Sequence, residues 1–519
     1  MLAKLPAEIW VHIASYLPDV QLCTLYLLNR LFYQLATDSL YRTVSAARSS
    51  QVTNQMVARL RSARYLGLWG VHVEGAHALV SRRNPALAKR IRSLEVDLTL
   101  IRALDPRRPA TVLAMKAISR MLRRVIRCPK QKHPFSRTSK SALELYNMLL
   151  DIARGAENLQ RVRFNVQTLD PIATDIHWAG DIWSLVSGRV PSLVLALTGD
   201  ELESILQAFE NLSRVKRLCI ELHLTHWDES KSACLAKLFN LASASLVSFE
   251  LKMDYSSHSS AFSTVFHNLD HFPKLKRVDL YVLFDDWTGP KVVQFLNSHE
   301  GSIEQFHFLP IVGAFGSLQS LSSLHLSNLR KLRLNLRFLR VTHRRKFCDG
   351  ILSFPALTDL TIISPGSDYL EVVIFSKAFG SLASPLRTLD LSISTLSRVV
   401  FDTLSTSFPQ IHCLTIRAQT LAHALGVEQE WNTGPFSKRM AVTRYPYWKL
   451  SDLTVFRESD DQPPQIQWPV MRILAACTPS IQSFCGNGHM DGPSNTENNV
   501  ASTRRSGTTG SENIMAWEL

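Results

Sequence analysis

The chain has 519 residues, of which 45% are hydrophobic and 20% are charged, and its formal net charge is +14. This composition is normal for a globular protein, and the length predicts two or three domains, or one small domain plus an extended repeat array. No apolar run approaches the roughly 18 to 20 residues that a membrane span requires, and Lys4 and Glu8 interrupt the apolar start, so we expect neither a membrane span nor a secretory signal.

The eight cysteines show no CxxC spacing, and none stands at zinc-ligand spacing from a histidine. In a chain of this length, this favours reduced and mostly buried thiols over the alternative of disulfides. We therefore expect a protein of the cytoplasm or the nucleus, with no metal site and no cofactor.

Residues 1–48 predict a small domain of three short helices. Pro6 stands where a helix begins, a position at which its missing N–H costs nothing. Pro18 ends this first helix and Asp19 can cap the second, while Asn29 and Arg30 open the third. Three short helices hold too few apolar groups for a secure core of their own, so their apolar stripes need cover from the rest of the chain or from another protein.

The segment LPAEIWVHIASYLPDV, with the leucines and the Leu31-Phe32 pair that follow it, resembles an F-box. One departure is Leu31-Phe32, which stands where the family usually has Trp. F-boxes bind the Skp adaptor of SCF-type cullin-RING ubiquitin ligases, so the resemblance implies such an adaptor and ligase core as partners. It also implies an adaptor-binding set that comprises Leu5, Pro6, Ile9, Ile13, Leu17, Leu22, Leu25, Leu28 and Phe32. The alternative is that these helices only cap the open end of a repeat array.

A short cassette with apolar residues at i, i+3 and i+5 recurs through most of the remaining chain. Its central residues are Leu94, Val162, Leu193, Leu218, Phe249, Val278, Phe306, Leu332, Leu360, Leu389, Leu414 and Leu453, and from Leu218 to Leu414 they recur every 25 to 31 residues. The alternation at the end of the cassette predicts a strand, and the segments between cassettes have apolar residues at helical spacing. One strand and one helix cannot bury their own apolar faces, so the units must stack into a parallel sheet with helices on its other side.

This LxxLxL cassette resembles the leucine-rich repeat family, although Gln167, Arg337 and Ser394 replace the Asn that usually follows the strand. The resemblance implies an α/β solenoid over residues 49–485, with parallel strands on the concave face and helices on the convex face. A generic α/β protein with evenly spaced strands is the alternative. The long step from Leu94 to Val162 predicts a basic helical insertion over about residues 101–158. Residues 486–519 are poor in large apolar side chains and predict a disordered tail.

The positive charge is concentrated in one part of the chain. Residues 59–163 contain 23 Lys or Arg against 7 Asp or Glu, and residues 330–346 contain eight Lys or Arg and no acid. We expect a basic patch made of Lys116, Arg120, Arg123, Arg124, Arg127, Arg344, Arg345 and Lys346. Such a patch attracts an acidic or phosphorylated protein segment or a nucleic acid, unless it is only a solvated outer face.

The residues between the inward-facing leucines of each cassette face the open side of the predicted sheet. The predicted substrate surface comprises Arg161, Arg163, Glu221, Glu250, Lys252, Asp279, Tyr281, His307, Arg333, Asp390 and Arg417. Its mixed charge suits a protein partner better than a uniform polyanion.

Motifs of catalysis are missing from the sequence: there is no GxSxG elbow, Walker-type glycine loop, HExxH or dinucleotide fingerprint. The sequence therefore favours a non-catalytic substrate-recognition subunit of a ubiquitin ligase, which binds the adaptor with its first helices and an unknown substrate protein with its repeats. The alternative is a repeat scaffold whose basic region binds nucleic acid or another polyanion.

Overall fold

The computed structural model describes residues 10, 34–35, 43–46, 89–97, 149–166, 177–223, 227–253, 262–283, 288–311, 323–335, 354–363, 386–424, 427–429, 433–459 and 462–486. The chain divides into two compact units, Met1–Lys274 and Leu275–Leu519. Each unit is described by itself.

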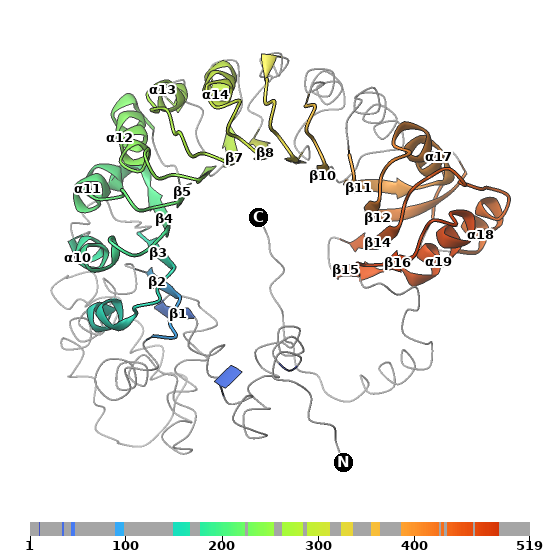
Figure 1. Ribbon diagram of the computed structural model, residues 1–519, viewed down its shortest axis with the longest axis horizontal. Coiled ribbons are helices and arrows are strands. Elements are labelled where there is room, and N and C mark those ends of the chain that lie inside the picture. Colours follow the sequence, from blue (N-terminus) through green and yellow to red (C-terminus); the bar gives the residue numbers. More distant parts are fainter. Residues whose placement is uncertain are drawn as a thin grey trace, which may run out of the picture. The chain divides into compact units, whose positions relative to one another are not determined.

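The first unit is a parallel sheet with helices on one side of it (Figure 1). Its strands follow in chain order as β1 (Thr43–Ala46), β2 (Ser93–Asp97), β3 (Arg161–Asn165), β4 (Ser192–Thr198), β5 (Arg217–His223) and β6 (Ser248–Met253). Its helices are residues 149–155, α10 (His177–Val186), α11 (Leu202–Ala208), α12 (Glu229–Asn240) and α13 (Ser263–His267), and the 3-10 turn η3 (Gly199–Glu201) precedes α11.

The second unit repeats this architecture and adds two antiparallel strands. Its parallel strands are β7 (Arg277–Leu283), β8 (Gln305–Ile311), β9 (Lys331–Asn335), β10 (Asp359–Ile363), β11 (Thr388–Leu396), β12 (Cys413–Ala424), β14 (Asp452–Ser459) and β16 (Ser483–Phe484). Its helices are α14 (Thr288–Asn297), α17 (Arg398–Ser407), α18 (Thr433–Met440) and α19 (Trp468–Cys477).

The register of the strands confirms the cassette reading of the sequence. In the first unit the central residues Leu94, Val162, Leu193, Leu218 and Phe249 are direct partners on neighbouring strands. The second unit places its own central residues in one row in the same way: Val278, Phe306, Leu332, Leu360, Leu389, Leu414 and Leu453. All of them are buried, so this row forms the inner face of each sheet.

Two hairpins were not predicted. β13 (Val427–Gln429) pairs antiparallel with β12, and β15 (Gln462–Ile466) pairs antiparallel with β14. The sequence expectation of one strand per repeat was wrong here because β12 and β14 run on beyond their cassettes and fold back. β15 contains Pro463 and Pro464, which cannot donate to a ladder and are tolerated at a sheet edge.

Asparagines at the ends of helices join successive repeats on the helical side. Asn240, at the end of α12, donates its side-chain amide to the Asn268 carbonyl and accepts from the Asp270 amide, at 2.9 Å in both cases. Asn297, at the end of α14, donates to the Ser323 carbonyl and accepts from the His325 amide, both at 2.8 Å. These side chains satisfy turn groups that would otherwise lack partners.

Aromatic side chains fill the space between strands and helices in the first unit. Phe239 of α12 stacks on Phe249 of β6 with ring centroids 4.1 Å apart, and Phe249 also meets Phe272 edge-on at 6.2 Å. Phe239, Phe249 and Phe272 are each 0% exposed, so this cluster ties one repeat to the next.

We predict that Phe249→Ala lowers the free energy of unfolding by about 3 to 5 kcal/mol, because it empties a large buried volume between α12 and β6. Chemical denaturation followed by circular dichroism measures the change. Lys237, which is exposed on the same helix, provides the control: Lys237→Ala should change the free energy by no more than about 0.5 kcal/mol. Equal effects of the two substitutions would contradict this account of the core.

Candidate protein-binding face

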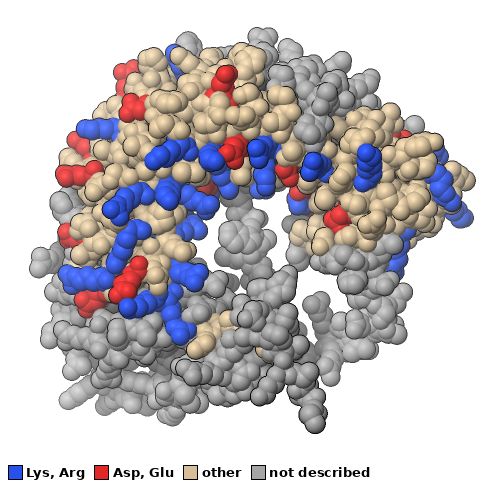
Figure 2. All heavy atoms as spheres, in the orientation of Figure 1, with Lys and Arg blue, Asp and Glu red and all other residues tan. Residues whose placement is uncertain are grey.

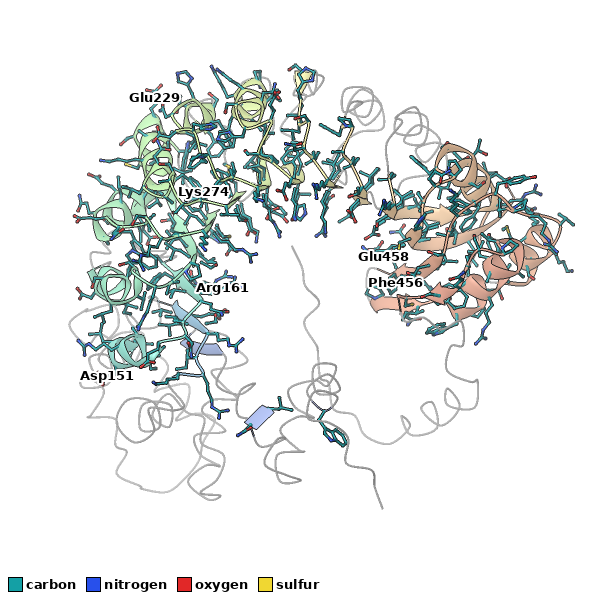
Figure 3. The ribbon with its side chains drawn as sticks, viewed as in Figure 1. Asp151, Arg161, Glu229, Lys274, Phe456 and Glu458 are labelled. Carbon is teal, nitrogen blue, oxygen red and sulfur yellow. The ribbon has the colours of Figure 1, made fainter. Side chains whose placement is uncertain are left out.

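The side of each sheet that carries no helices presents the residues adjacent to the buried cassette positions. In the first unit it includes Arg161 and Arg163 on β3, Glu221 on β5, and Glu250 and Lys252 on β6, as the sequence predicted. Arg161 lies on the strand side of this unit, whereas Asp151 and Glu229 belong to its helical side (Figure 3). Strand alternation therefore gathers residues from distant parts of the sequence on one surface.

A network of ion pairs crosses this face in the first unit. Arg163 Nη2 lies 2.5 Å from Glu221 Oε2, Lys252 Nζ lies 3.4 Å from Glu221 Oε1, and Lys252 Nζ lies 2.8 Å from Glu250 Oε1. Arg163 and Glu221 stand on β3 and β5, so their contact passes over the intervening strand β4. Ala196, the residue of β4 that is the direct partner of Glu221, has a side chain short enough to leave room for the bridge.

The Cys219 thiol lies within this network and is held in its neutral form. Burial raises the pKa of the Cys219 thiol, and the negative charges of Glu250 and Glu221 raise it further. Burial by itself would lower the pKa of Lys252, but its hydrogen bond to Glu250 and the neighbouring negative charges outweigh burial and raise it. A protonated Lys252 and a neutral thiol are thus the stable states of this surface.

Asp279 in the second unit is less accessible than the sequence predicted. Its side chain is 2% exposed and lies beneath Arg277, whose Nε is 2.8 Å from Asp279 Oδ2. His307, the direct partner of Asp279 on β8, places Nδ1 2.8 Å from Asp279 Oδ1. A partner would therefore meet Arg277 and His307, and Asp279 would hold them in place from below.

A second pair in this unit joins Asp390 of β11 to Arg417 of β12, with Arg417 Nη2 3.1 Å from Asp390 Oδ2. The Arg417 guanidinium also lies over the Phe456 ring, 5.8 Å from its centroid. Burial raises the pKa of Asp390, and the positive charges of Arg417 and Arg333 oppose that rise. Arg333 is exposed and Tyr281 is half-buried, so both are accessible on the predicted face.

In each of these ion pairs the carboxylate is less exposed than its cation. The exposed fractions of acid and base are 18% and 35% for Glu221–Arg163, 28% and 39% for Glu250–Lys252, 2% and 39% for Asp279–Arg277, and 22% and 29% for Asp390–Arg417. In the first unit, Lys and Arg gather over the strands with fewer acids among them (Figure 2). A partner would therefore meet mainly cations, even though the count of charges is balanced.

The predicted surface includes Arg161, at which β3 begins, but sequence reasoning missed the residues at which the neighbouring strands β4 and β5 begin. Arg217 opens β5 and is exposed, and Ser192 opens β4 between Arg217 and Arg161. They stand one position before the central residue of each cassette. Successive side chains of a strand point to opposite faces, so this position also lies on the face without helices. Reading the row before the central residue, in addition to the row after it, would have found them.

Two predicted sets lie outside the described residues. These are the adaptor-binding set from Leu5 to Phe32 and the basic patch at residues 116–127 and 344–346. Among residues 1–48 the structure describes Trp10, Gln34 and Leu35 as helical, and Arg90 Nη1 donates to the Gln34 carbonyl at 3.1 Å. Of the predicted insertion it describes the end of a helix at residues 149–155, and of the predicted tail it describes only Gly486.

The end of the predicted helical domain belongs to the sheet. Thr43–Ala46 form β1, which pairs in parallel with β2 from Thr43↔Ser93 to Ala46↔Val96. The sequence analysis assigned these residues to the helical domain, but the β-branched pair Thr43-Val44 favours a strand, and β2 offers a free edge with which to pair.

Residues 2–47 match the family model for F-box-like domains. The comparison with curated proteins finds no match. Among solved structures, the chain is similar to a chain of "Crystal structure of Rad7 and Elc1 complex in yeast", with 13% identity and a TM-score of 0.32 over 55% of this chain and 77% of that chain. Within the described ranges no three His, Cys, Asp or Glu side chains are grouped to hold a metal ion, and no described helix has the length and apolarity to cross a bilayer.

We predict that Glu221→Gln speeds the alkylation of Cys219 relative to Cys413 in the same chain. The substitution removes a negative charge that raises the Cys219 pKa and leaves the positive charge of Lys252, which lowers it, so a larger fraction is thiolate at a given pH. Iodoacetamide labelling followed by peptide mass spectrometry measures the ratio. Glu229→Gln, at the exposed start of α12, should leave the ratio unchanged, and an unchanged ratio in Glu221→Gln would show that the network does not control the thiol.

Proposed function

We propose that this chain is a non-catalytic substrate-recognition subunit of an SCF-type cullin-RING ubiquitin ligase. Its F-box-like segment binds the Skp adaptor, and the open face of its sheet binds the substrate protein. The observation that carries the proposal is that the matched segment, residues 2–47, contains β1, the first strand of the sheet, near its end. An adaptor-binding element and a partner-binding face are therefore joined without a long linker.

The repeat architecture that we propose is a leucine-rich repeat solenoid. Its support is the in-register row of cassette residues in each unit and the helices that cover the same side of successive strands (Figure 1). Stacked repeats of this kind offer an extended surface, because each repeat contributes one strand to the same face. Such a surface suits the capture of a folded protein or of an extended segment of one.

The proposed mechanism is recruitment. Ubiquitin transfer is the work of other subunits, and this chain raises the local concentration of the substrate near them. In the first unit, a sheet stiffened by backbone pairing from β1 to β6 and by a buried aromatic cluster is suited to this role, because a rigid support would maintain one distance between a substrate bound to it and the adaptor. The contacts of Arg90 with Gln34 and of β1 with β2 would anchor the F-box-like segment to the first repeats.

The competing function is a scaffold whose first helices only cap the repeats and whose basic region binds nucleic acid. The two functions differ in what the first helices contact. In the scaffold they cover the chain's own core, whereas in the receptor they keep an apolar surface available to the adaptor. Binding to the adaptor therefore decides between them.

We predict that Leu5→Ala/Pro6→Ala weakens adaptor binding by about 2 kcal/mol or more, which is about a 30-fold loss of affinity, because it truncates a predicted anchor of the interface. A pull-down with purified Skp adaptor, quantified by titration, measures the change. Val442→Ala, which shortens a side chain that is 79% exposed in the second unit, should bind the adaptor as the unchanged protein does.

Thermal unfolding of the variants is the control for folding. The receptor function requires that Leu5→Ala/Pro6→Ala lose the adaptor while its unfolding midpoint stays close to that of the unchanged chain. Failure of the unchanged protein to bind the adaptor, or undiminished binding by this variant, would exclude the proposed function.

A further inference from the structure

One row of residues crosses five parallel strands of the first unit in an alternating order. From β2 to β6 it reads Ser93, Arg161, Ser192, Arg217 and Ser248, each the direct partner of the next. All of them directly precede buried cassette residues, so their side chains lie on the face without helices. Each arginine is thus flanked on both sides by serines, whose short side chains leave its guanidinium uncovered.

Arg161 and Arg217 are exposed, and neither forms an ion pair with any residue that the structure describes. They are separated by the single strand that carries Ser192, so their backbones are about 10 Å apart, twice the spacing of neighbouring strands. Both side chains are long enough to converge over Ser192. Two guanidinium groups that approach each other without a counter-ion repel, and an anion between them would relieve that repulsion.

We propose that Arg161, Ser192 and Arg217 form a binding site for one phosphorylated serine or threonine side chain of a partner protein. A phosphate group has three terminal oxygens and a charge near −2, so it can accept hydrogen bonds from both guanidinium forks and from the Ser192 hydroxyl. The carboxylate of Asp or Glu has one charge and two oxygens and would satisfy only part of this set. The chemistry of the site therefore selects a phosphate over a carboxylate.

The surroundings strengthen the attraction for an anion at this edge. Arg92 and Lys216, both exposed, stand directly before β2 and before Arg217. No Asp or Glu occurs at residues 92–93, 160–161, 191–192, 216–217 or 247–248, the pairs of positions at which the strands of this row begin. At these positions the beginning of β2–β6 therefore carries positive charge and no negative charge.

The same face disfavours a polyanion such as RNA or DNA. Glu95 on β2 and Glu250 on β6 each stand two residues after the member of the row on the same strand, about 7 Å further along it. Glu221 on β5 stands further along still, two residues after the position level with Glu250. Glu221 and Glu250 already pair with Arg163 and Lys252, so these two cations offer little net positive charge to a continuous phosphate backbone that ran along the strands. The outward positions of β2–β6 also carry no Phe, Tyr or Trp on which bases could stack. A single phosphate on a protein segment fits this arrangement better.

The phosphate site depends on the proposed function only in that the bound protein would then be ubiquitinated. Binding of a phosphorylated peptide itself needs no adaptor. The direct test is fluorescence anisotropy with the full chain and a short degenerate peptide library that contains one fixed phosphoserine. The matched probe is the same library with serine at that position. We expect the unchanged protein to bind the phosphorylated library at least about 10-fold more tightly, and its affinity to rise with pH as the second phosphate proton leaves near pH 6.

Substitution at the row should remove this preference. Arg161→Gln and Arg217→Gln should each weaken binding of the phosphorylated library about 10-fold, and Arg217→Lys, which keeps the charge but loses the fork, should weaken it less than Arg217→Gln. Ser192→Glu, which places a carboxylate between the guanidinium groups, should compete with the phosphate and abolish the preference. The control is Arg154→Gln/Lys237→Gln, which removes two positive charges from exposed positions on the helical side of the same unit and should leave the preference intact.

Three outcomes would overturn the site. The first is equal affinity for the phosphorylated and unphosphorylated libraries, and the second is an equal loss of affinity in the row variants and in the control. The third is an RNA oligonucleotide that binds more tightly than the phosphorylated library and whose binding the same row variants abolish. Adaptor binding by Arg161→Gln/Arg217→Gln, measured in parallel, separates the two proposals. A receptor that lacks this phosphate site would still bind the adaptor, and a phosphate site without receptor function would persist in Leu5→Ala/Pro6→Ala.

Discussion

In-register pairing of parallel strands is the constraint on which the rest of this structure depends. Because each cassette aligns its central residue with that of the next strand, every position of the cassette becomes a row across the sheet. One row is buried beneath the helices, and the rows beside it face outward. A slip of one residue in a single strand would move its leucines to the open face, so the apolar cassettes maintain the register of the polar rows as well.

The outward rows contain similar numbers of acidic and basic residues, yet they present mainly cations to a binding partner. The carboxylates Glu221 and Asp279 sit below the cations that they pair with, and their exposed fractions are 18% and 2%. Acids that are less exposed than their cations position the guanidinium and ammonium groups and reduce the conformational freedom that those groups would lose on binding. Arg161 and Arg217 differ because no described acid neutralises them, and this makes the edge at which the strands begin distinct from the middle of the sheet.

The F-box-like segment and the sheet are continuous in structure as well as in sequence. β1 lies inside the matched segment, and its backbone completes the edge of β2. β1 then forms the end of the described sheet order, and its length of 4 residues limits unwanted pairing, because short edge strands offer few free backbone groups. The same few residues thus serve the stability of the repeats and the connection to the proposed adaptor-binding helices.

The sequence by itself determined the α/β repeat, the buried row of each unit and the resemblance of the first helices to an F-box, because apolar spacing and a short motif are local properties. Only the tertiary structure decided that Asp279 is covered by Arg277, that Arg163 reaches Glu221 across β4, and that Ser192 lies between Arg161 and Arg217. It also decided that β12 and β14 fold back into hairpins. For Arg163, Glu221 and Ser192 the physical reason is that the strands are separated by connections of unequal length, so sequence distance does not reveal which side chains become neighbours. For Asp279 and Arg277, which lie on the same strand, the packing around the pair decides which side chain is covered, and the spacing of two residues does not reveal it.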